Sequence, residues 1–200
     1  MATLFVDKLD PQSGTALEIG TSGDTITVPS GATLNVAGTI TNSGTATGFG
    51  GTNTPAFEAY LGSNTGFLTN NSYVKVQCNT EVYDTDSAYD NSTNYRFTPQ
   101  TAGKYYVYGA VGTNSNGDDR LRNSYATIYK NGSQYRDATF NHSGNPGRTD
   151  TVFVSAILDM NGSSDYVELY GAVNDNSGSN QGYFLATDKI TYFGAYKIIT

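Results

Sequence analysis

The sequence predicts an all-β protein in which a two-sheet antiparallel sandwich follows a short fibrous β-stem, with three chains assembled together. Composition is the first reason: Gly (23) and Tyr (16) are abundant, Trp is absent, and charged residues make up 14% of the 200 positions. Strands favour Thr, Val, Ile, Tyr and Phe, whereas helices favour Ala, Leu, Glu, Lys and Arg. The second reason is periodicity, because no stretch keeps an apolar i, i+3, i+4, i+7 pattern. The third is the repetitive character of the N-terminal region.

Residues 19–54 are predicted to form a β-repeat stem followed by a Gly-rich hinge. Short runs of Thr with Ile, Val or Leu are separated by Gly turns, and apolar residues recur at Ile19, Ile26, Leu34 and Ile40. Each run alternates apolar and polar residues, so it buries only one face. Stacked repeats need neighbours to bury that face, and three chains wound around a common axis would supply them. The alternative is a weakly repetitive linker.

Residues 1–18 are interpreted as a segment that docks onto a larger assembly. Leu4, Phe5, Val6 and Leu9 are the candidate docking residues, because they are apolar and have no partners nearby. The segment lacks the basic region and apolar core of a signal peptide, and no apolar run approaches membrane-spanning length. We therefore expect synthesis in a cytoplasm and no membrane insertion.

Residues 55–200 are predicted to form the sandwich, because many short strands with turn signals between them are typical of that architecture. Cys78 is the only cysteine, so an internal disulfide is excluded. It lies in phase with Val74 and Val76, which predicts a buried thiol. The predicted strands are Ala56–Leu61, Tyr73–Cys78, Tyr95–Thr98, Gly103–Val111, Asn123–Tyr129, Tyr135–Phe140, Thr151–Leu158, Tyr166–Val173 and Lys189–Ile199, the last with an alternative start near Tyr183.

The sequence shows no constellation typical of an enzyme, and no cofactor is expected. A Ser-His-Asp triad would have to use His142, the single histidine, which is interpreted as a surface loop residue. No nucleophile elbow, phosphate loop or zinc-ligand spacing is present. A glycan depolymerase is the less favoured alternative. Its paired acids would come from Asp84, Asp118, Asp119 and Asp175.

The acidic run at residues 81–90 is interpreted as a solvated loop. Asp84, Asp86 and Asp90 are oxygen ligands of the kind that Ca²⁺ takes, but the run lacks the glycine and terminal glutamate of an EF-hand. Calcium binding therefore stays an alternative, and no metal site is predicted. The net charge of −7, with eleven scattered Lys and Arg, argues against a nucleic-acid partner.

Four stretches of the head, in their order and spacing, carry a resemblance to a known family. They are Pro55–Leu61, Tyr95–Gly109, Ile157–Leu169 and Tyr192–Ile198. Through them, residues 55–198 resemble the globular head of complement component C1q and the related tumour necrosis factor-like jelly rolls. The resemblance implies a ten-stranded jelly roll that forms tight homotrimers about an aromatic-lined axis, and some complement-like heads bind calcium near that axis. The candidate trimer-interface residues on the matching strands are Phe57, Tyr106, Tyr108, Tyr192 and Phe193.

The first 36 residues resemble the start of tail-fibre and other virion proteins of marine tailed phages. Animal relatives of the head usually carry a collagen stem with Gly at every third residue, and this chain has none. The resemblance implies a virion structural protein, such as a tail fibre, that is assembled in the host cytoplasm and contacts other virion proteins through its N-terminus. A capsid-decorating or cement trimer is the alternative, and a secreted bacterial lectin-like module is a weaker one.

Strand parity predicts which loops face away from the stem. If both termini of the head lie at the stem, as the resemblance implies, the loops 112–119, 141–150 and 174–182 share the far end, and the tight turns 130–133 and 161–164 share the near end. Loops on a rigid sandwich commonly carry binding, and amides and carboxylates suit sugar hydroxyls. We expect contact with a host surface glycan or envelope protein, and ordinary solvated loops are the alternative. The candidate receptor-facing residues are Asn114, Asn116, Asp118, Asp119, Arg120, His142, Asn145, Arg148, Asn174, Asp175 and Asn180.

Overall fold

The computed structural model describes residues 15, 17, 19, 21–41, 53–142, 144–176 and 180–198. It divides the chain into two units, Met1–Thr47 and Gly48–Thr200. The division falls inside the Gly-rich segment that was predicted to be a hinge, most of which lies outside the described residues. The two units are taken in turn below.

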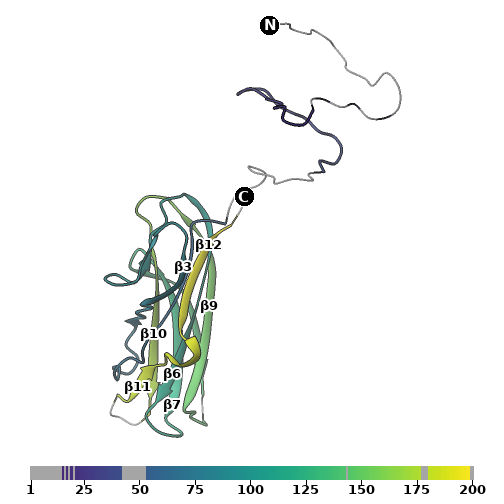
Figure 1. The fold of residues 1–200 in the computed structure, drawn as a ribbon. Helices are drawn as coiled ribbons and strands as arrows, with labels where there is room; N and C mark the ends of the chain where they lie inside the picture. Colours follow the sequence, from purple (N-terminus) through teal and green to yellow (C-terminus); the bar gives the residue numbers. More distant parts are fainter. Residues whose placement is uncertain are drawn as a thin grey trace. The chain divides into compact units, whose positions relative to one another are not determined.

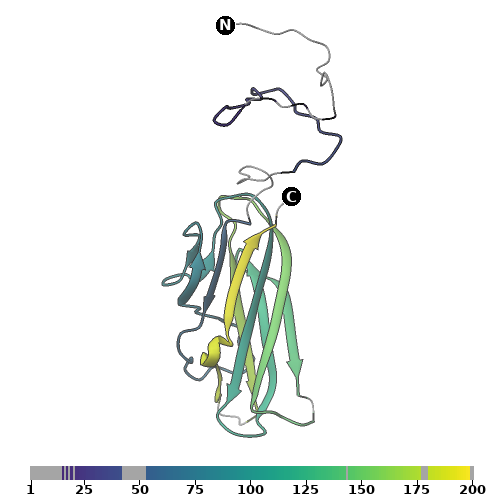
Figure 2. The ribbon, with the colours of Figure 1, turned by 45° about the vertical axis from the view of Figure 1, so that its right-hand side comes forward.

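The head unit is built from two antiparallel sheets whose strands run along its long direction (Figures 1 and 2). The first sheet consists of β1 (Ala56–Tyr60), β3 (Thr80–Asp84), β6 (Gly103–Ser115), β9 (Thr149–Met160), β11 (Gly182–Phe184) and β12 (Tyr192–Lys197). Its hydrogen-bonded order is β3-β1-β12-β6-β9, and β11 pairs with the end of β6 beyond β12. A single 3₁₀ turn, Thr187–Lys189, connects β11 to β12.

The second sheet packs across the first. Its strands are β2 (Val74–Lys75), β4 (Tyr89–Asp90), β5 (Arg96–Phe97), β7 (Leu121–Lys130), β8 (Ser133–Asn141) and β10 (Val167–Asp175). The order is β4-β5-β10-β7-β8, with β2 paired to β10. The chain therefore crosses repeatedly between the sheets, with only β4–β5, β7–β8 and β11–β12 staying within one sheet among the described strands. The prediction of an antiparallel jelly-roll sandwich is confirmed.

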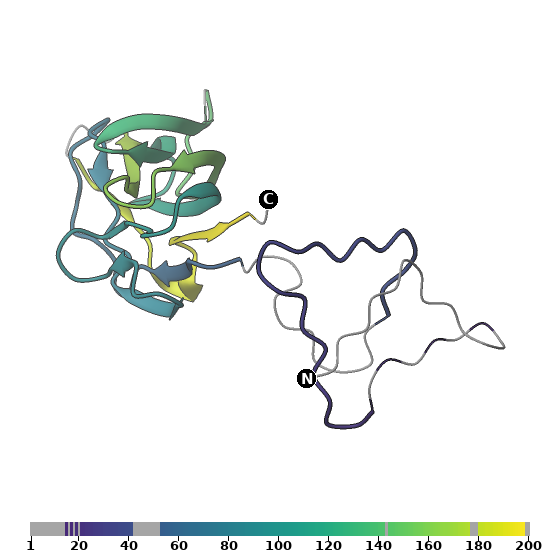
Figure 3. The same ribbon diagram turned by 90° about the horizontal axis from the view of Figure 1, so that it is seen from above.

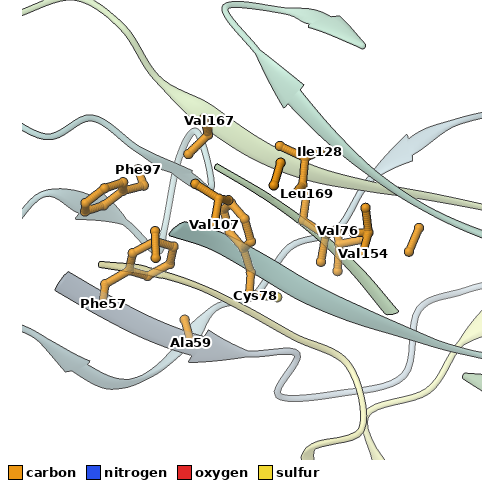
Figure 4. Close-up of a cluster of buried hydrophobic side chains, with 14 of the residues drawn as sticks. Phe57, Ala59, Val76, Cys78, Phe97, Val107, Ile128, Val154, Val167 and Leu169 are labelled. Atoms are coloured by element: carbon orange, nitrogen blue, oxygen red, sulfur yellow. The ribbon is translucent and has the colours of Figure 1, made fainter. Parts of the chain in front are cut away.

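The core lies between the two sheets (Figure 4). Alternate residues of β9 point into it, because side chains along a strand alternate between faces. At one end Phe57 stacks on Phe97 with ring centroids 4.7 Å apart, and Phe193 meets Phe57 edge-on at 5.1 Å. Cys78 is fully buried, as predicted, and burial raises the pKa of its thiol.

The acidic run was only partly predicted correctly. Residues 80–84 form β3, which pairs with β1, and β4 follows at Tyr89–Asp90. Asp84 closes the connection between them, since its Oδ1 accepts the Ala88 N–H and its Oδ2 accepts the Tyr89 N–H. The exposed edge position of β3 explains its polar composition, which hid the strand from a reading based on hydrophobic alternation.

The last predicted strand begins three residues late, at Tyr192, because the 3₁₀ turn occupies its start. The alternative start near Tyr183 corresponds to a separate short strand, β11. The second strand is also shorter than predicted, and only Val74–Lys75 of Tyr73–Cys78 pairs as β2.

The N-terminal unit has a different character. Residues 21–41, shown in purple in Figure 3, run in near-straight stretches joined by bends. Turns are closed by the Asp24 N–H on Thr21 O and the Ala32 N–H on Pro29 O. None of the described residues of this unit is in a strand, because a strand ladder needs a hydrogen-bonded neighbour and the isolated chain lacks one here. Leu34 is 70% exposed and Ile26 65%, so the single chain does not bury these apolar side chains. The trimeric stem that would cover them stays a prediction. Within the described residues, no helix of either unit has the length and apolar character needed to cross a bilayer.

Candidate functional site

The three long loops of the head meet at one end, the lower end in Figure 1. The chain enters and leaves the head at the other end, where the Lys197 N–H donates to Pro55 O at 3.2 Å. We call the described residues of these loops, 112–120, 141–142, 144–150, 174–176 and 180–182, together the loop end. Its loops are joined by backbone hydrogen bonds, such as Ser115 N–H to Arg148 O at 2.9 Å and Asn116 N–H to Gln181 O at 3.1 Å. The structure therefore brings together the three loops that strand parity placed at the far end.

Arg120 connects all three loops. Its N–H donates to Gly147 O at 3.0 Å, its carbonyl accepts the Asn176 N–H at 2.7 Å, and its Nη1 donates to Gln181 Oε1 at 2.9 Å. Near it, Arg148 Nη1 pairs with Asp118 Oδ1 at 3.1 Å, on side chains that are both more than half exposed. The loop end is thus an ordered surface with both charges displayed.

Most of the predicted receptor-facing residues reach the surface. The exposed ones are Asn116, Asp118, Asp119, Asn145, Arg148 and Asn180, and the half-buried ones are Arg120, His142 and Asn174.

Two predicted residues, Asn114 and Asp175, are buried. Asn114 belongs to β6, which runs four residues further than predicted, and its Nδ2 donates to Thr149 Oγ1 at 2.7 Å. Asp175 ends β10, and its backbone exchanges two hydrogen bonds with the Asn70 side chain. Both predictions were wrong because these strands extend into segments that look like loops.

His142 packs within the loop end. Its ring meets Phe140 edge-on with centroids 4.7 Å apart, and its Nε2 lies 3.6 Å from Asp150 Oδ2. The backbone N–H of His142 donates to Arg122 O at 2.8 Å. These contacts make it a half-buried residue that holds the β8–β9 connection.

The candidate calcium carboxylates have other partners. Asp84 closes the β3–β4 turn, and Asp90 accepts N–H bonds from Ser92, Thr93 and Asn94, which lower the pKa of its carboxyl. Among the residues that the structure describes, no group of three or more His, Cys, Asp or Glu side chains is placed to hold a metal.

A second candidate surface covers the outer side of the first sheet. Tyr106, Tyr108, Tyr192 and Tyr196 come from β6 and β12, and the ring centroids of Tyr106 and Tyr108 are 5.7 Å apart. With Tyr83 and Phe153 they line a cavity of about 460 Å³. We call these six residues the aromatic face.

The aromatic face also contains a side-chain hydrogen bond. Tyr108 Oη donates to Glu58 Oε2 at 2.8 Å, and burial together with this bond raises the pKa of Tyr108. Phe153 is 65% exposed, which is unusual for so large an apolar side chain.

Two of the five candidate interface residues lie elsewhere. Phe57 and Phe193 are buried in the core between the sheets, so they do not face a trimer axis in this fold. Period-two alternation is the reason, because Tyr192 and Phe193 are neighbours and must point to opposite faces. The same alternation would have found Tyr196, which was missed. Tyr83 was missed because the strand that carries it was not predicted. Phe153 was also missed, although it lies within a predicted strand.

The candidate docking residues Leu4, Phe5, Val6 and Leu9 lie outside the described residues.

Comparison with known proteins gives a structural likeness only. No family model matches the chain, and no curated protein matches it. The head is similar to the globular domain of zebrafish complement 1qA protein, with a TM-score of 0.47 and 16% identity over 72% of this chain and 97% of that one. It is also similar to the Eiger TNF of S. frugiperda, with a TM-score of 0.48 and 12% identity over 72% of this chain and 91% of that one.

Proposed function

We propose that the chain is a homotrimeric, non-enzymatic structural protein of a virus particle, a tail fibre or appendage whose head recognises the host surface. The observation that carries this proposal is the loop end, an ordered, polar surface at the end of the head opposite Pro55, where the stem joins. A display head places its binding loops there. The virion location rests on the resemblance of the first 36 residues to phage virion proteins.

The aromatic face supports self-association. Large apolar patches on a soluble protein mark interaction surfaces, and interfaces are enriched in aromatic residues. Phe153 of the aromatic face lies on β9, which is an edge of the first sheet. Ile157, on the same strand, is 57% exposed. The exposed apolar side chains of residues 17–40 add a second surface that assembly would cover.

Sedimentation equilibrium tests the trimer. The wild-type chain should sediment at about three times its mass of 21.3 kDa. Phe153→Lys would place a charge in the interface, so it should shift the protein to single chains at micromolar concentration. Phe140→Lys is the matched control, because Phe140 is 49% exposed on β8 of the other sheet. A wild-type chain that is folded and monomeric would contradict the trimer.

Adsorption to cells of the host tests recognition. The double variant Asp118→Ala/Arg148→Ala removes an exposed ion pair at the loop end, and it should reduce binding of the trimer to the cells several-fold. Lys104→Ala/Asp159→Ala removes a similarly exposed pair towards the stem end and should bind as wild type does. Equal binding by all three proteins would count against a receptor surface at the loop end. Imaging labelled particles separates a fibre, present in a few trimers, from a capsid decoration present in many.

A further inference from the structure

A second cavity, of about 380 Å³, lies beside the loop end, between the β1–β2 connection and β11. Its lining consists of Asn64, Thr65, Gly66, Phe67, Asn116 and Tyr183. Four of these residues belong to the β1–β2 connection, Tyr183 belongs to β11, and Asn116 comes from the loop end. We call it the Phe67 cavity.

The wall of the Phe67 cavity is fastened to β11 by hydrogen bonds on both sides of Tyr183. The Thr65 N–H donates to Phe184 O at 3.1 Å, and its Oγ1 accepts the Phe184 N–H at 2.9 Å. The Leu68 N–H donates to Gly182 O at 2.8 Å. The other edge of β11 pairs with β6, so β11 is held from both sides and the cavity is formed before any ligand binds. Preformed sites avoid the ordering cost of binding.

Hydrogen bonds also hold the two asparagines that line the cavity. The Ala186 N–H donates to Asn64 Oδ1 at 2.7 Å, which fixes the plane of that side-chain amide. At the other wall, the Asn116 N–H donates to Gln181 O. Hydrogen bonds therefore hold both asparagines at the cavity, Asn64 through its side chain and Asn116 through its backbone.

Phe67 gives the cavity its apolar surface. Its side chain is 58% exposed, although its neighbours are ordered, and its ring centroid lies 6.0 Å from that of Tyr183 at an interplanar angle of 54°. Two tilted rings form an angled apolar wall next to amide and hydroxyl groups. None of the six lining residues is charged.

This combination matches the chemistry of a neutral sugar ring. One face of a pyranose presents C–H groups, which pack on an aromatic ring, while its hydroxyls need donors and acceptors of the kind that amides and Tyr provide. A cavity of about 380 Å³ is at the low end of ligand sites, which span roughly 300–1,000 Å³, so it suits a single ring. The absence of charge from the lining, on a chain of net charge −7, disfavours acidic sugars.

We propose that the Phe67 cavity binds one neutral pyranose unit of a host-surface glycan. This inference rests on the proposed function and names the ligand class and the residues that select it. Phe67 packs on the sugar face, and Asn64, Asn116 and Tyr183 bind its hydroxyls.

Binding of the intact trimer to immobilised polysaccharides tests the proposal. The probes are neutral dextran, mannan and galactan, with acidic polygalacturonate and alginate for comparison. Wild type should bind at least one neutral polymer and neither acidic one, and Phe67→Ala should weaken that binding about tenfold, a loss on the scale of one aromatic packing contact. Tyr135→Ala, which removes a similarly exposed ring (46%) on β8 outside both the cavity and the loop end, should bind as wild type does.

The outcomes separate the inference from the function it rests on. If wild type adsorbs to host cells and Phe67→Ala adsorbs equally well, the cavity is not the sugar site and the recognition function stands. If wild type does not adsorb to host cells, the proposed function itself fails. Binding to the acidic polymers alone, or to none of the five, overturns the sugar assignment. Sedimentation of Phe67→Ala at the mass of one chain would show that the ring is a subunit contact, which also overturns it.

Discussion

Arg120 Nη1 and Gln181 Oε1 meet at 2.9 Å and join the connection after β6 to the connection before β11. The same arginine is bonded through its backbone to Gly147 and Asn176. One residue is thereby bonded to each of the other two connections that form the loop end. The geometry of the loop end depends on it more than on any exposed residue there.

Replacing Arg120 with Ala should destabilise the head by about 1.5–3 kcal/mol, the range for a lost hydrogen bond to a charged group. The backbone bonds remain, so the fold should persist. Urea unfolding measures the loss. Arg122→Ala is the control, since Arg122 is exposed on β7, and its effect should stay within about 0.5 kcal/mol. Similar losses in both variants would contradict the linking role of Arg120.

Lys75 and Glu168 form an ion pair at 2.6 Å in which the Glu168 side chain is 4% exposed. Lys75→Met should cost about 3–5 kcal/mol, because it leaves a buried carboxylate without its partner. Adding Glu168→Gln to that variant should recover part of the loss.

The exposed pair of Lys104 and Asp159, 2.8 Å apart, provides the comparison for Lys75. Lys104→Met should cost less than about 1 kcal/mol, because solvent screens exposed pairs. Chemical unfolding of the variants gives these values. A cost for Lys75→Met no larger than that for Lys104→Met would show that burial of Glu168 is not decisive.

Gly162 should tolerate no side chain. Its φ is +73°, and an added Cβ would lie against the backbone of Ala102 and 2.8 Å from the carbonyl carbon of Thr101. Gly162→Ala should therefore destabilise the head by more than about 1–3 kcal/mol, the cost of the backbone conformation alone. Gly132 has a similar φ of +76°, but its Cβ would meet only Tyr166 Oη, at 3.4 Å. In thermal unfolding, the melting temperature of Gly162→Ala should lie well below that of Gly132→Ala. The reverse order would be inconsistent with the clash.

The head should lose stability in alkali. Burial, with the Asp137 charge, raises the pKa of Tyr73 to about 12, and burial raises the pKa of Tyr105 to about 12. A phenol whose folded-state pKa exceeds its ordinary value of about 10 favours folding fully below pH 10. That contribution is lost as the pH rises towards 12.

Urea midpoints measured from pH 8 to pH 12 check this prediction. The urea midpoint of wild type should decrease as the pH rises above about 10. The midpoint of Tyr105→Phe should decrease less steeply. Tyr135→Phe, a change at an exposed position, should keep the wild-type slope. The absence of Trp lets tyrosinate absorbance follow the same titration cleanly. A midpoint that stays constant through pH 12 would disprove the link.

The sequence predicts the long central strands well because their alternation is visible. β9 shows it most clearly, with Val152, Val154, Ala156 and Leu158 facing the core. The same rule, applied strictly, excludes Phe193 from the face that holds Tyr192. β3 escaped prediction because an edge strand with few buried side chains has no hydrophobic signature.

The candidate sites divide in a similar way. Parity along the chain places the three loops at one end, since it needs only the direction of successive strands. It does not reveal that β6 and β10 continue far enough to bury Asn114 and Asp175. The meeting of Phe67 with Tyr183 has no local signal, because it depends on how the β1–β2 connection lies along β11.

The position of β1 has a mechanical consequence. β1 follows Pro55 directly and is hydrogen-bonded along its length to β12 on one side and β3 on the other. Ladder bonds in antiparallel pairs lie perpendicular to the strands. A pull between Pro55 and a ligand held at the loop end acts along β1, so it shears all of these bonds at once instead of opening them one by one. A head loaded between these two points therefore resists mechanical unfolding.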